Sequence, residues 1–412
     1  MLLNMILRTI YPHILESIRN KPVTLITGAR QTGKTFLCRE IHETMGINYV
    51  TLADRQEREL ANKDPDAFLK IHGTPLIIDE IQKSKSLFDS IEATVDKAIF
   101  ERKNCKGMYI ITGSQAYKLM EGVSESLAGR VGIIHMSPLS ISEIVGRENI
   151  PFVPDPIISS SRKIDKDLSS VYADIYRGNY PELYDNKELK AHTFYADYVD
   201  TYIAQDVMEL INLRDQHKFF NFMQVLASLT GQELVESTVC NSAGINSRTL
   251  KEWLSVLEAG EIIRLMQPYN GASTVKRVTK RPKIYFRDTG LACYLARITD
   301  PEILMASYLK GPMAETYIVN EIIKTYTNQK ENAAFYYYRS SDGNEVDLLI
   351  QRNGKINLIE CKGGIETDAS DVNTFGRLGE TKDKIGPSCI VCMTETPYPV
   401  KKDVYAIPVT SI

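Results

Sequence analysis

Short apolar runs alternate with amphipathic stretches through the first part of the chain. Residues 22–36 have the pattern of a strand, a glycine-containing loop and the start of a helix, and residues 75–80 and 108–113 read as further short apolar strands. Helical periodicity fills the intervals between these strands. Because strands that alternate with helices build a parallel sheet covered by helices, this part of the chain predicts an α/β fold.

The pattern changes after Pro138. Residues 146–170 contain three prolines and a run of three serines, which predicts a linker. Residues 171–235 are rich in helical patterns, and residues 236–290 have the pattern of a small helical unit that ends in a hairpin. A further helix from Pro312 and strands at 334–338, 345–351 and 356–361 complete the prediction.

The composition bounds the class of protein. Hydrophobic residues make up 43% and charged residues 25% of the 412 positions, which excludes wholesale disorder and a collagen-like chain. At about 150 residues per domain, this length predicts two to three domains. The net charge of −3, from 49 basic and 52 acidic residues, excludes a uniformly basic protein. It leaves room for a local basic face, because a sum hides its distribution.

The lack of a recognisable targeting segment and the pattern of cysteines predict a cytoplasmic protein. A membrane-spanning helix needs about 18 or more apolar residues in succession, and the sequence has no such run. We expect Met1–Ile18 to form an amphipathic helix on its own protein instead of a signal peptide. Seven scattered cysteines are typical of reduced thiols. Cys389 and Cys392 lie in an apolar run, which predicts buried strand residues and not zinc ligands.

Residues 28–35 form a phosphate-binding loop. The sequence fits G-x-x-x-x-G-K-[ST] throughout, after an apolar strand and before a helical stretch, which is the context that the motif requires. Backbone N–H groups of such a loop wrap the phosphates. Lys34 would reach the β- and γ-phosphates of ATP, and the Thr35 hydroxyl would bind Mg²⁺. The nucleotide-binding candidates in this loop are Gly28, Ala29, Arg30, Gln31, Thr32, Gly33, Lys34 and Thr35.

The two following strands end in residues that fit the same chemistry. The strand Leu76–Glu80 ends in two carboxylates, so Asp79 would lie near the metal and Glu80 would polarise the attacking water. Taken alone, it could also be a strand that ends in solvated acids. The next strand ends near Ser114, our candidate sensor of the γ-phosphate, with Thr112 as its alternate.

Arg130 is a candidate for stabilising transition-state charge, in its own subunit or in a neighbouring one. A surface salt bridge is the alternative.

Several segments together resemble a known family. They resemble a widespread group of prokaryotic AAA-type ATPases with a C-terminal domain of unknown function, and Lys283–Leu291 carries the most specific part of this likeness. The resemblance implies a RecA-like ATPase core with a helical lid, then a winged helix and an α/β restriction-endonuclease-like end. The other segments, in chain order, are Gly28–Thr35, Leu76–Glu80, Thr112–Ser114, Leu127–Val131, Pro138–Glu143 and Arg177–Glu182.

Pattern and resemblance divide the chain into four parts. We expect the ATPase core at residues 1–150, a linker and helical lid at 151–215, the winged helix at 216–300 and the nuclease-like domain at 301–412.

A helix-turn-helix pattern precedes a basic hairpin. Helical segments at 232–243 and 248–259 flank a short turn, and Ile262–Leu265 can pair with Lys283–Phe286. Seven basic and no acidic residues occur from Arg264 to Arg287. With Arg248 and Lys251, residues 248–287 could contact nucleic-acid phosphates. Alternatively, the hairpin docks on an acidic face of the same protein. The seven basic residues are Arg264, Lys276, Arg277, Lys280, Arg281, Lys283 and Arg287.

Carboxylates and a lysine gather on two predicted strands near the C-terminus. Asn353-Gly354 is a strong hairpin signal between them, so Asp347 and Glu360 should face each other across paired strands. They would hold Mg²⁺, and Lys362 would orient the attacking water or stabilise phosphorane charge. This arrangement resembles the (P)D…(D/E)-x-K constellation of restriction-type nucleases, although Val346 replaces the usual proline. Glu315 matches the upstream acid of that fold.

Two alternatives to a working nuclease stay open. The acids and the lysine could form a salt-bridged sheet edge, or the fold could be nuclease-like but inactive.

Three functional hypotheses follow. The leading one is a Mg²⁺-dependent ATPase, possible as a homo-oligomer, whose C-terminal domains act on nucleic acid and could cleave DNA. The second is a nucleotide-dependent switch that binds DNA or a protein and does not cleave. The third is an ATPase that acts on proteins.

Overall fold

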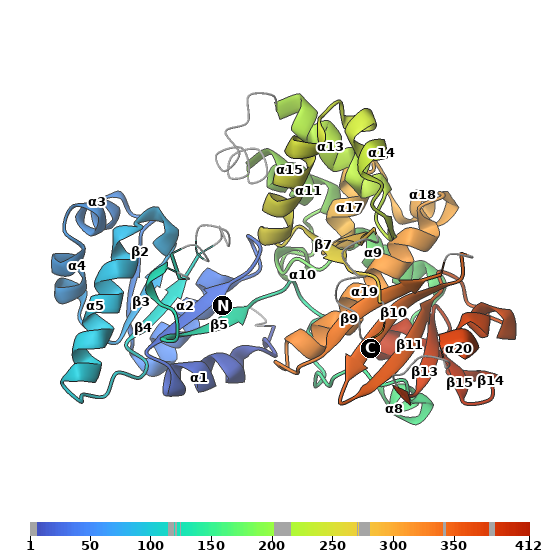
Figure 1. Ribbon diagram of the computed structural model, residues 1–412, viewed down its shortest axis with the longest axis horizontal. Coiled ribbons are helices and arrows are strands. Elements are labelled where there is room, and N and C mark those ends of the chain that lie inside the picture. Colours follow the sequence, from blue (N-terminus) through green and yellow to red (C-terminus); the bar gives the residue numbers. More distant parts are fainter. Residues whose placement is uncertain are drawn as a thin grey trace. The chain divides into compact units, whose positions relative to one another are not determined.

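The chain folds into two compact units (Figure 1). The first comprises Leu7–Pro138 together with Ala259–Glu261, and the second comprises the rest of the chain from Leu139 to Ile412. We expected the ATPase core to reach residue 150, but residues 139–150 fold with the second unit. The computed structural model describes residues 6–113, 119, 122–123, 125–201, 216–269, 271, 281–340, 343–378 and 384–412.

The first unit is built on a parallel sheet of five strands in the order β2-β3-β4-β1-β5. Strands β1, β3 and β4 are buried along their whole length, because helices cover both faces of a parallel sheet. The strands are β1 (Val23–Thr27), β2 (Asn48–Thr51), β3 (Leu76–Asp79), β4 (Tyr109–Thr112) and β5 (Val131–His135). The helices are α1 (Tyr11–Asn20), α2 (Lys34–Met45), α3 (Arg55–Lys63), α4 (Pro65–His72) and α5 (Ser86–Phe100).

Alternation along the strands creates two separate cores in this unit. Ile77 and Ile110 pack with Ile14 of α1 and with α2, whereas Ile78 and Ile111 pack with α5 on the opposite face. Side chains of consecutive strand residues point to opposite faces, so continuous apolar runs supply both cores. The three strands predicted in this part are therefore confirmed.

Helix α1 begins later than the sequence suggested. It starts at Tyr11, with Pro12 in its first turn, where the missing N–H of proline costs no hydrogen bond. Residues 1–5 of the expected helix Met1–Ile18 lie outside the described residues.

The second unit starts with helices. The expected linker at 146–170 contains α8 and the beginning of α9, and both have aspartate N-caps. The helices are α7 (Ile141–Ile144), α8 (Pro156–Arg162), α9 (Leu168–Arg177), α10 (Glu182–Asp185), α11 (Ala191–Tyr198), α13 (Gln216–Ser228), α14 (Glu236–Ala243), α15 (Ser247–Ala259), α17 (Thr289–Leu295), α18 (Pro301–Ala306), α19 (Lys310–Thr327) and α20 (Asn373–Leu378).

A helical pair and a small antiparallel sheet occupy the middle of this unit. Helices α14 and α15 flank the turn at Gly244, as predicted, and Gly244 takes a left-handed φ of 66°. The first helix was expected from residue 232, but it begins at Glu236, because residues 232–233 form a strand instead. The expected hairpin is also present, since β7 pairs with β8 in the sheet order β6-β8-β7. These strands are β6 (Gln232–Glu233), β7 (Ile263–Met266) and β8 (Lys283–Phe286).

The last part of the chain forms a mixed sheet. Strands β10 and β11 are joined by Asn353 and Gly354, both with positive φ, as a tight hairpin turn requires. Helix α19 packs on one face of this sheet and α20 on the other. The strands are β9 (Ala334–Arg339), β10 (Glu345–Arg352), β11 (Lys355–Cys361), β12 (Lys384–Ile385), β13 (Ser388–Cys392), β14 (Tyr398–Lys401) and β15 (Val404–Pro408).

Membrane and cysteine features complete the description. Within the described ranges, no helix has the length and apolar character needed to span a bilayer. All seven cysteines are free thiols, and Cys389 and Cys392 are buried in β13, as predicted.

Candidate nucleotide site and carboxylate cluster

The phosphate loop joins β1 to α2 and is closely packed. Gly28 has a φ of 146°, and a Cβ atom there would lie 2.2 Å from the carbonyl oxygen of Met136, so only glycine fits. The buried Lys34 donates from Nζ to the carbonyl oxygens of Gly28 (2.8 Å) and Ala29 (2.6 Å). Burial lowers the pKa of Lys34 to about 8.

Thr35 and Asp79 are brought into direct contact. The Thr35 hydroxyl, at the start of α2, donates to Oδ2 of Asp79, at the end of β3, over 2.9 Å. The Tyr49 hydroxyl donates to the same oxygen over 2.9 Å and helps to fix the carboxylate. A hydroxyl and a carboxylate oxygen are ligands that Mg²⁺ prefers, and nucleotide phosphates and water usually supply the rest. These two residues therefore fit the metal that the sequence implies.

Glu80 is held by a neighbour that the sequence did not single out. Its backbone is in the left-handed region with a φ of 60°, and Gln82 donates from Nε2 to Oε2 of Glu80 over 2.5 Å. Within the described residues, Oε1 of Gln82 and Oγ1 of Thr112 are buried without a hydrogen-bond partner. A buried polar atom of this kind usually bonds to water or a ligand. The only sequence signal for Gln82 was its place directly after the Asp79-Glu80 pair.

Arg8 was also missed by the sequence analysis. Its guanidinium donates to the carbonyl oxygen of Thr32 in the phosphate loop (2.7 Å) and to that of Ser137 (2.6 Å). It therefore ties the loop to the segment that follows β5. No local motif marks Arg8, because its partners are far away in the sequence.

The remaining residues predicted to bind the nucleotide differ in their burial. Ala29 and Thr32 are buried in the loop, and the Thr32 hydroxyl donates to the carbonyl oxygen of Ala29. Arg30 is half-buried and Gln31 exposed. Ser114 lies outside the described residues.

Arg130 takes part in a salt bridge at the protein surface. It contacts Asp96 at 2.6 Å and Glu92 at 3.2 Å, both on α5. Its side chain is 26% exposed. Within one chain, Arg130 therefore forms the surface salt bridge that was the alternative to a catalytic function.

The predicted carboxylates Glu315 and Asp347 lie close together, and a lysine that was not expected there, Lys283, is paired with both. Lys283 of β8 projects its buried ammonium to Glu315 of α19 (2.8 Å) and to Asp347 of β10 (3.4 Å). It also forms an ion pair with Glu345. Tyr285, two residues further along β8, donates its hydroxyl to Glu315 over 2.6 Å. We call Lys283, Glu315, Glu345 and Asp347 the carboxylate cluster.

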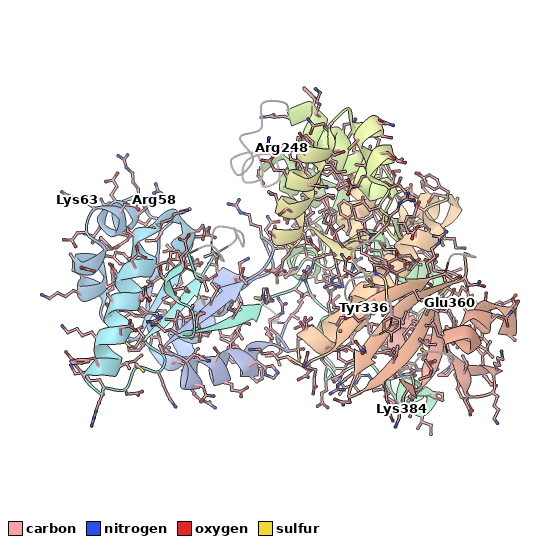
Figure 2. The ribbon with its side chains drawn as sticks, in the orientation of Figure 1. Arg58, Lys63, Arg248, Tyr336, Glu360 and Lys384 are labelled. Carbon is pink, nitrogen blue, oxygen red and sulfur yellow. The ribbon has the colours of Figure 1, made fainter. Side chains whose placement is uncertain are left out.

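Glu360 of β11 (Figure 2) lines the same pocket as this cluster. Lys362 contacts Glu360 and Asp371, each at 3.1 Å, and the backbone N–H of Cys361 donates to Oδ2 of Asp347 over 2.9 Å. Burial and the charge of Asp347 raise the pKa of Glu360, and burial raises the pKa of Glu315. Glu360 therefore lies close to Asp347, as the hairpin predicted, and Lys362 is paired with Glu360.

The carboxylate cluster does not fit the Mg²⁺ ion that the nuclease resemblance implies. In the described parts of the chain, no three Asp, Glu, His or Cys side chains are arranged to hold a metal ion. The Lys283 ammonium lies among the carboxylates where such an ion would bind.

This position also corrects the picture of the basic hairpin. Lys283 was counted on a nucleic-acid face, but it is only 2% exposed and cannot reach phosphates. Docking of the hairpin on an acidic face of the same protein, the alternative from the sequence, is what the structure shows for this residue.

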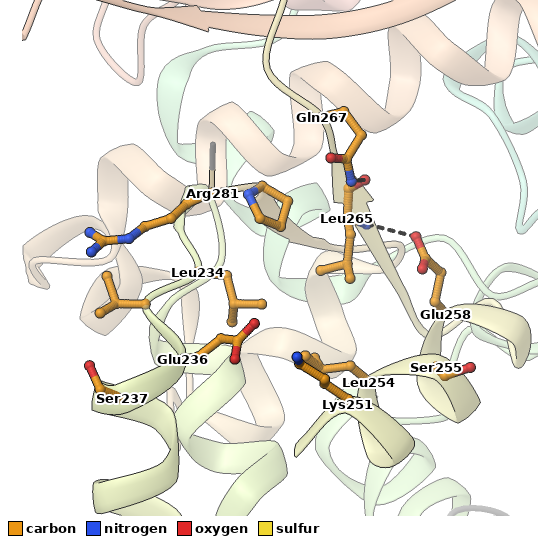
Figure 3. Close-up of a pocket in the computed structure, with 12 residues that line it drawn as sticks. Leu234, Glu236, Ser237, Lys251, Leu254, Ser255, Glu258, Leu265, Gln267 and Arg281 are labelled. Atoms are coloured by element: carbon orange, nitrogen blue, oxygen red, sulfur yellow. Dashed lines mark hydrogen bonds between the residues drawn. The ribbon is translucent and has the colours of Figure 1, made fainter. Parts of the chain in front are cut away.

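Several other basic residues of 248–287 have side chains that solvent reaches, some of them only in part. Arg248 (Figure 2) and Lys251 on α15 and Arg281 before β8 are exposed, and Arg264 and Arg287 are partly buried. A pocket of about 700 Å³ lies beside them, where Lys251 and Arg281 flank the apolar side chains of Leu234, Leu254 and Leu265 (Figure 3). Lys276, Arg277 and Lys280 lie outside the described residues.

The fold and the loop geometry define the first unit as a P-loop α/β domain. Comparison with protein families agrees, because residues 20–145 match the model of an AAA domain. This finding supports a nucleotide-hydrolysing AAA-type ATPase. Two further stretches match domains of unknown function, DUF8612 at 169–302 and DUF4143 at 310–412.

Individual proteins also match this chain in sequence, over more than half of its length. An uncharacterized protein of Mycobacterium tuberculosis is 24% identical over 402 residues, which cover 96% of this chain and 82% of the relative. An uncharacterized protein of Methanocaldococcus jannaschii is 25% identical over 299 residues, covering 65% of this chain and 60% of its own. Among solved structures, the Walker-type ATPase of Pyrococcus abyssi aligns with a TM-score of 0.37 at 16% identity, over 70% of this chain and 95% of that one.

Proposed function

We propose that the chain is a Mg²⁺-dependent ATPase that hydrolyses ATP in its first unit and acts on nucleic acid through its second. The contact between Thr35 and Asp79 carries the first half of this proposal. It joins the hydroxyl of the phosphate loop to the carboxylate of the neighbouring apolar strand, the pair that P-loop enzymes use to hold Mg²⁺.

The other residues of the site take complementary parts. On binding of ATP, the Lys34 ammonium exchanges its two loop carbonyls for the β- and γ-phosphates. Glu80 orients the attacking water, and Gln82 positions its carboxylate. Thr35 and Asp79 would hold Mg²⁺, which would supply positive charge to the phosphates in the transition state.

Steady-state hydrolysis of ATP tests this assignment. Lys34→Ala should abolish turnover, and chelation of Mg²⁺ should do the same to the wild type. Lys70→Ala is the matched control, because Lys70 is an exposed lysine of the same unit on α4. The assignment is wrong if Lys34→Ala hydrolyses ATP as fast as the wild type.

Nucleic-acid binding by the second unit is supported by the exposed basic side chains of α15 and of the segment before β8. Arg248, Lys251 and Arg281 can neutralise phosphates, and each neutralised phosphate releases counterions. We therefore expect a DNA affinity that falls steeply as salt rises. In Arg248→Ala/Lys251→Ala the affinity and the salt dependence should both fall. Lys187→Ala/Lys190→Ala, which also removes two exposed lysines from this unit, should leave both unchanged.

The position of Lys283 favours one version of this function, namely a nucleotide-dependent switch with an inactive nuclease-like domain. Incubation of the wild type with DNA and Mg²⁺ or Mn²⁺, with and without ATP, should then yield no cleavage. Nicking that disappears in Asp347→Ala would instead support the nuclease. Failure to bind DNA even at low salt would favour an ATPase that acts on proteins.

A further inference from the structure

One buried ammonium satisfies several carboxylates in the second unit. Lys283 is 3% exposed at its side chain, and its Nζ atom lies 2.8 Å from Glu315 and 3.4 Å from Asp347. Glu345 completes the set as a third ionic partner. A charge this deeply buried is stable only when it is paired and hydrogen-bonded, and Lys283 meets both conditions.

The surrounding residues hold the ammonium in place. Lys283 and Tyr285 lie two positions apart on β8, so both side chains project to the same face, and both reach Glu315. The Lys283 ammonium also lies 5.6 Å from the ring centre of Tyr337. The other carboxylate oxygen of Glu345, Oε2, lies 3.4 Å from a guanidinium nitrogen of Arg339. Each of the cluster's carboxylates thus has a cationic partner supplied by the chain itself.

A divalent ion would compete for the same oxygens. Mg²⁺ binds oxygen at about 2.0–2.1 Å and demands near-octahedral geometry. An ammonium within hydrogen-bond distance of those oxygens occupies the space and repels a second cation. The absence of any three-residue metal-binding group in the described ranges agrees with this conclusion.

We propose that the ammonium of Lys283 is the resident cation of the carboxylate cluster and excludes divalent metal ions from it. A strand of the basic hairpin thereby closes the place where the nuclease-like arrangement would hold its metal. The proposal goes beyond the ATPase function, because it holds whether or not the first unit hydrolyses ATP.

Binding of Mn²⁺ in the absence of nucleotide tests the proposal, with the free ion measured by electron paramagnetic resonance. Lys283→Met keeps an unbranched side chain, one atom shorter, and removes its charge. This variant should bind one more Mn²⁺ per chain than the wild type. Adding Asp347→Asn to Lys283→Met should abolish the gain, and Lys283→Arg, which keeps the cation, should show none. The phosphate loop is intact in all variants, so any Mn²⁺ that it binds is common to them.

Asp347→Asn alone keeps the proposal testable if Lys283→Met does not fold. The wild type and Asp347→Asn should bind the same amount of Mn²⁺. The proposal is overturned if Asp347→Asn binds one Mn²⁺ fewer than the wild type, because the cluster would then already hold a metal. It is equally overturned if folded Lys283→Met gains no Mn²⁺ site. ATP hydrolysis by the same preparations is measured separately, so a failure of the ATPase assignment would be distinguished.

Discussion

The hydroxyl of Thr35 donates a hydrogen bond of 2.9 Å to Asp79, although 44 positions separate the two residues in the sequence. Parallel pairing makes this contact possible. Strands β1 and β3 both pair with β4 in parallel, so their carboxyl ends lie at the same edge of the sheet. The loop after β1 and the carboxylate that ends β3 therefore meet, as ligand sites in open α/β sheets generally do.

Replacing the Thr35 hydroxyl should remove one protein ligand of the proposed Mg²⁺. We expect Thr35→Val to lower kcat for ATP hydrolysis by about 100-fold or more, since even outer partners of a metal ligand contribute about 10–100-fold. Thr35→Ser keeps the hydroxyl and should stay within a few-fold of the wild type. Equal loss in both variants, measured at saturating Mg²⁺, would contradict a ligand function for the hydroxyl.

The lowered pKa of Lys34 makes ATP binding depend on pH. In the nucleotide-free protein the ammonium loses its proton as pH rises through about 8, because burial disfavours the charge. Phosphates favour the charged form, so above this pH binding must take up a proton. The Kd for ATP should therefore rise by up to about tenfold per pH unit above pH 8.

Fluorescence titration with a labelled nucleotide from pH 7 to 9.5 measures this dependence. Lys34→Arg provides the comparison, because a guanidinium stays charged throughout. A wild-type Kd that is constant over this range would show that Lys34 does not titrate there.

A buried ion pair fastens the start of the second unit. Lys324 donates to Glu321 over 2.7 Å and to the carbonyl oxygen of Leu139 over 2.8 Å, and Glu321 accepts from the backbone N–H of Ile141 over 2.8 Å. Lys324→Met would leave the Glu321 charge buried without its cation. The free energy of unfolding of this unit should then fall by about 3–5 kcal/mol.

The single tryptophan reports on this unit alone. Trp253 is buried in its core, so its fluorescence follows unfolding of this unit in urea. Glu321→Gln/Lys324→Met removes both charges and should cost less than Lys324→Met. Lys355→Met, at an exposed site, should have no effect. A double variant at least as unstable as Lys324→Met would contradict the assigned pairing.

Thiol reactivity should separate the cysteines into two groups. Cys105 and Cys240 are partly exposed, and the other five are buried. Burial raises the pKa of Cys392 to about 11 and raises that of Cys389 well above its ordinary value, which suppresses the reactive thiolate. We expect two thiols to react quickly with a disulfide reagent in the native protein and all seven in denaturant. Rapid native labelling of Cys389, located by peptide mass spectrometry, would contradict the buried assignment.

Local patterns in the sequence sufficed for several features of the fold. The glycines and Lys34-Thr35 predicted the strand, loop and helix of the nucleotide site, because each element depends on neighbouring residues. The same holds for the hairpin at Asn353-Gly354, whose positive φ angles these residue types tolerate. Regular alternation along β10 and β11 likewise placed Asp347 beside Glu360.

The boundaries were less predictable. Proline-rich residues 146–170 read as a linker, yet α8 and the start of α9 form there. Aspartate side chains cap both helices, and α9 buries Val171, Tyr172 and Ile175 in the core of the unit. The end of the first unit at Pro138 depends on where residues 139–150 pack, which no local pattern encodes.

The sequence by itself therefore determined the phosphate loop, the acidic strand end and the C-terminal hairpin, since short-range periodicity and turn chemistry specify them. Only the tertiary structure decided which partners these groups meet. It brought Arg8 to the loop, and it turned Lys283 from an apparent surface cation into the buried counter-ion of Glu315 and Asp347. The physical reason is that burial and ion pairing are set by residues distant in the chain, whereas a charge count registers only that Lys283 is basic.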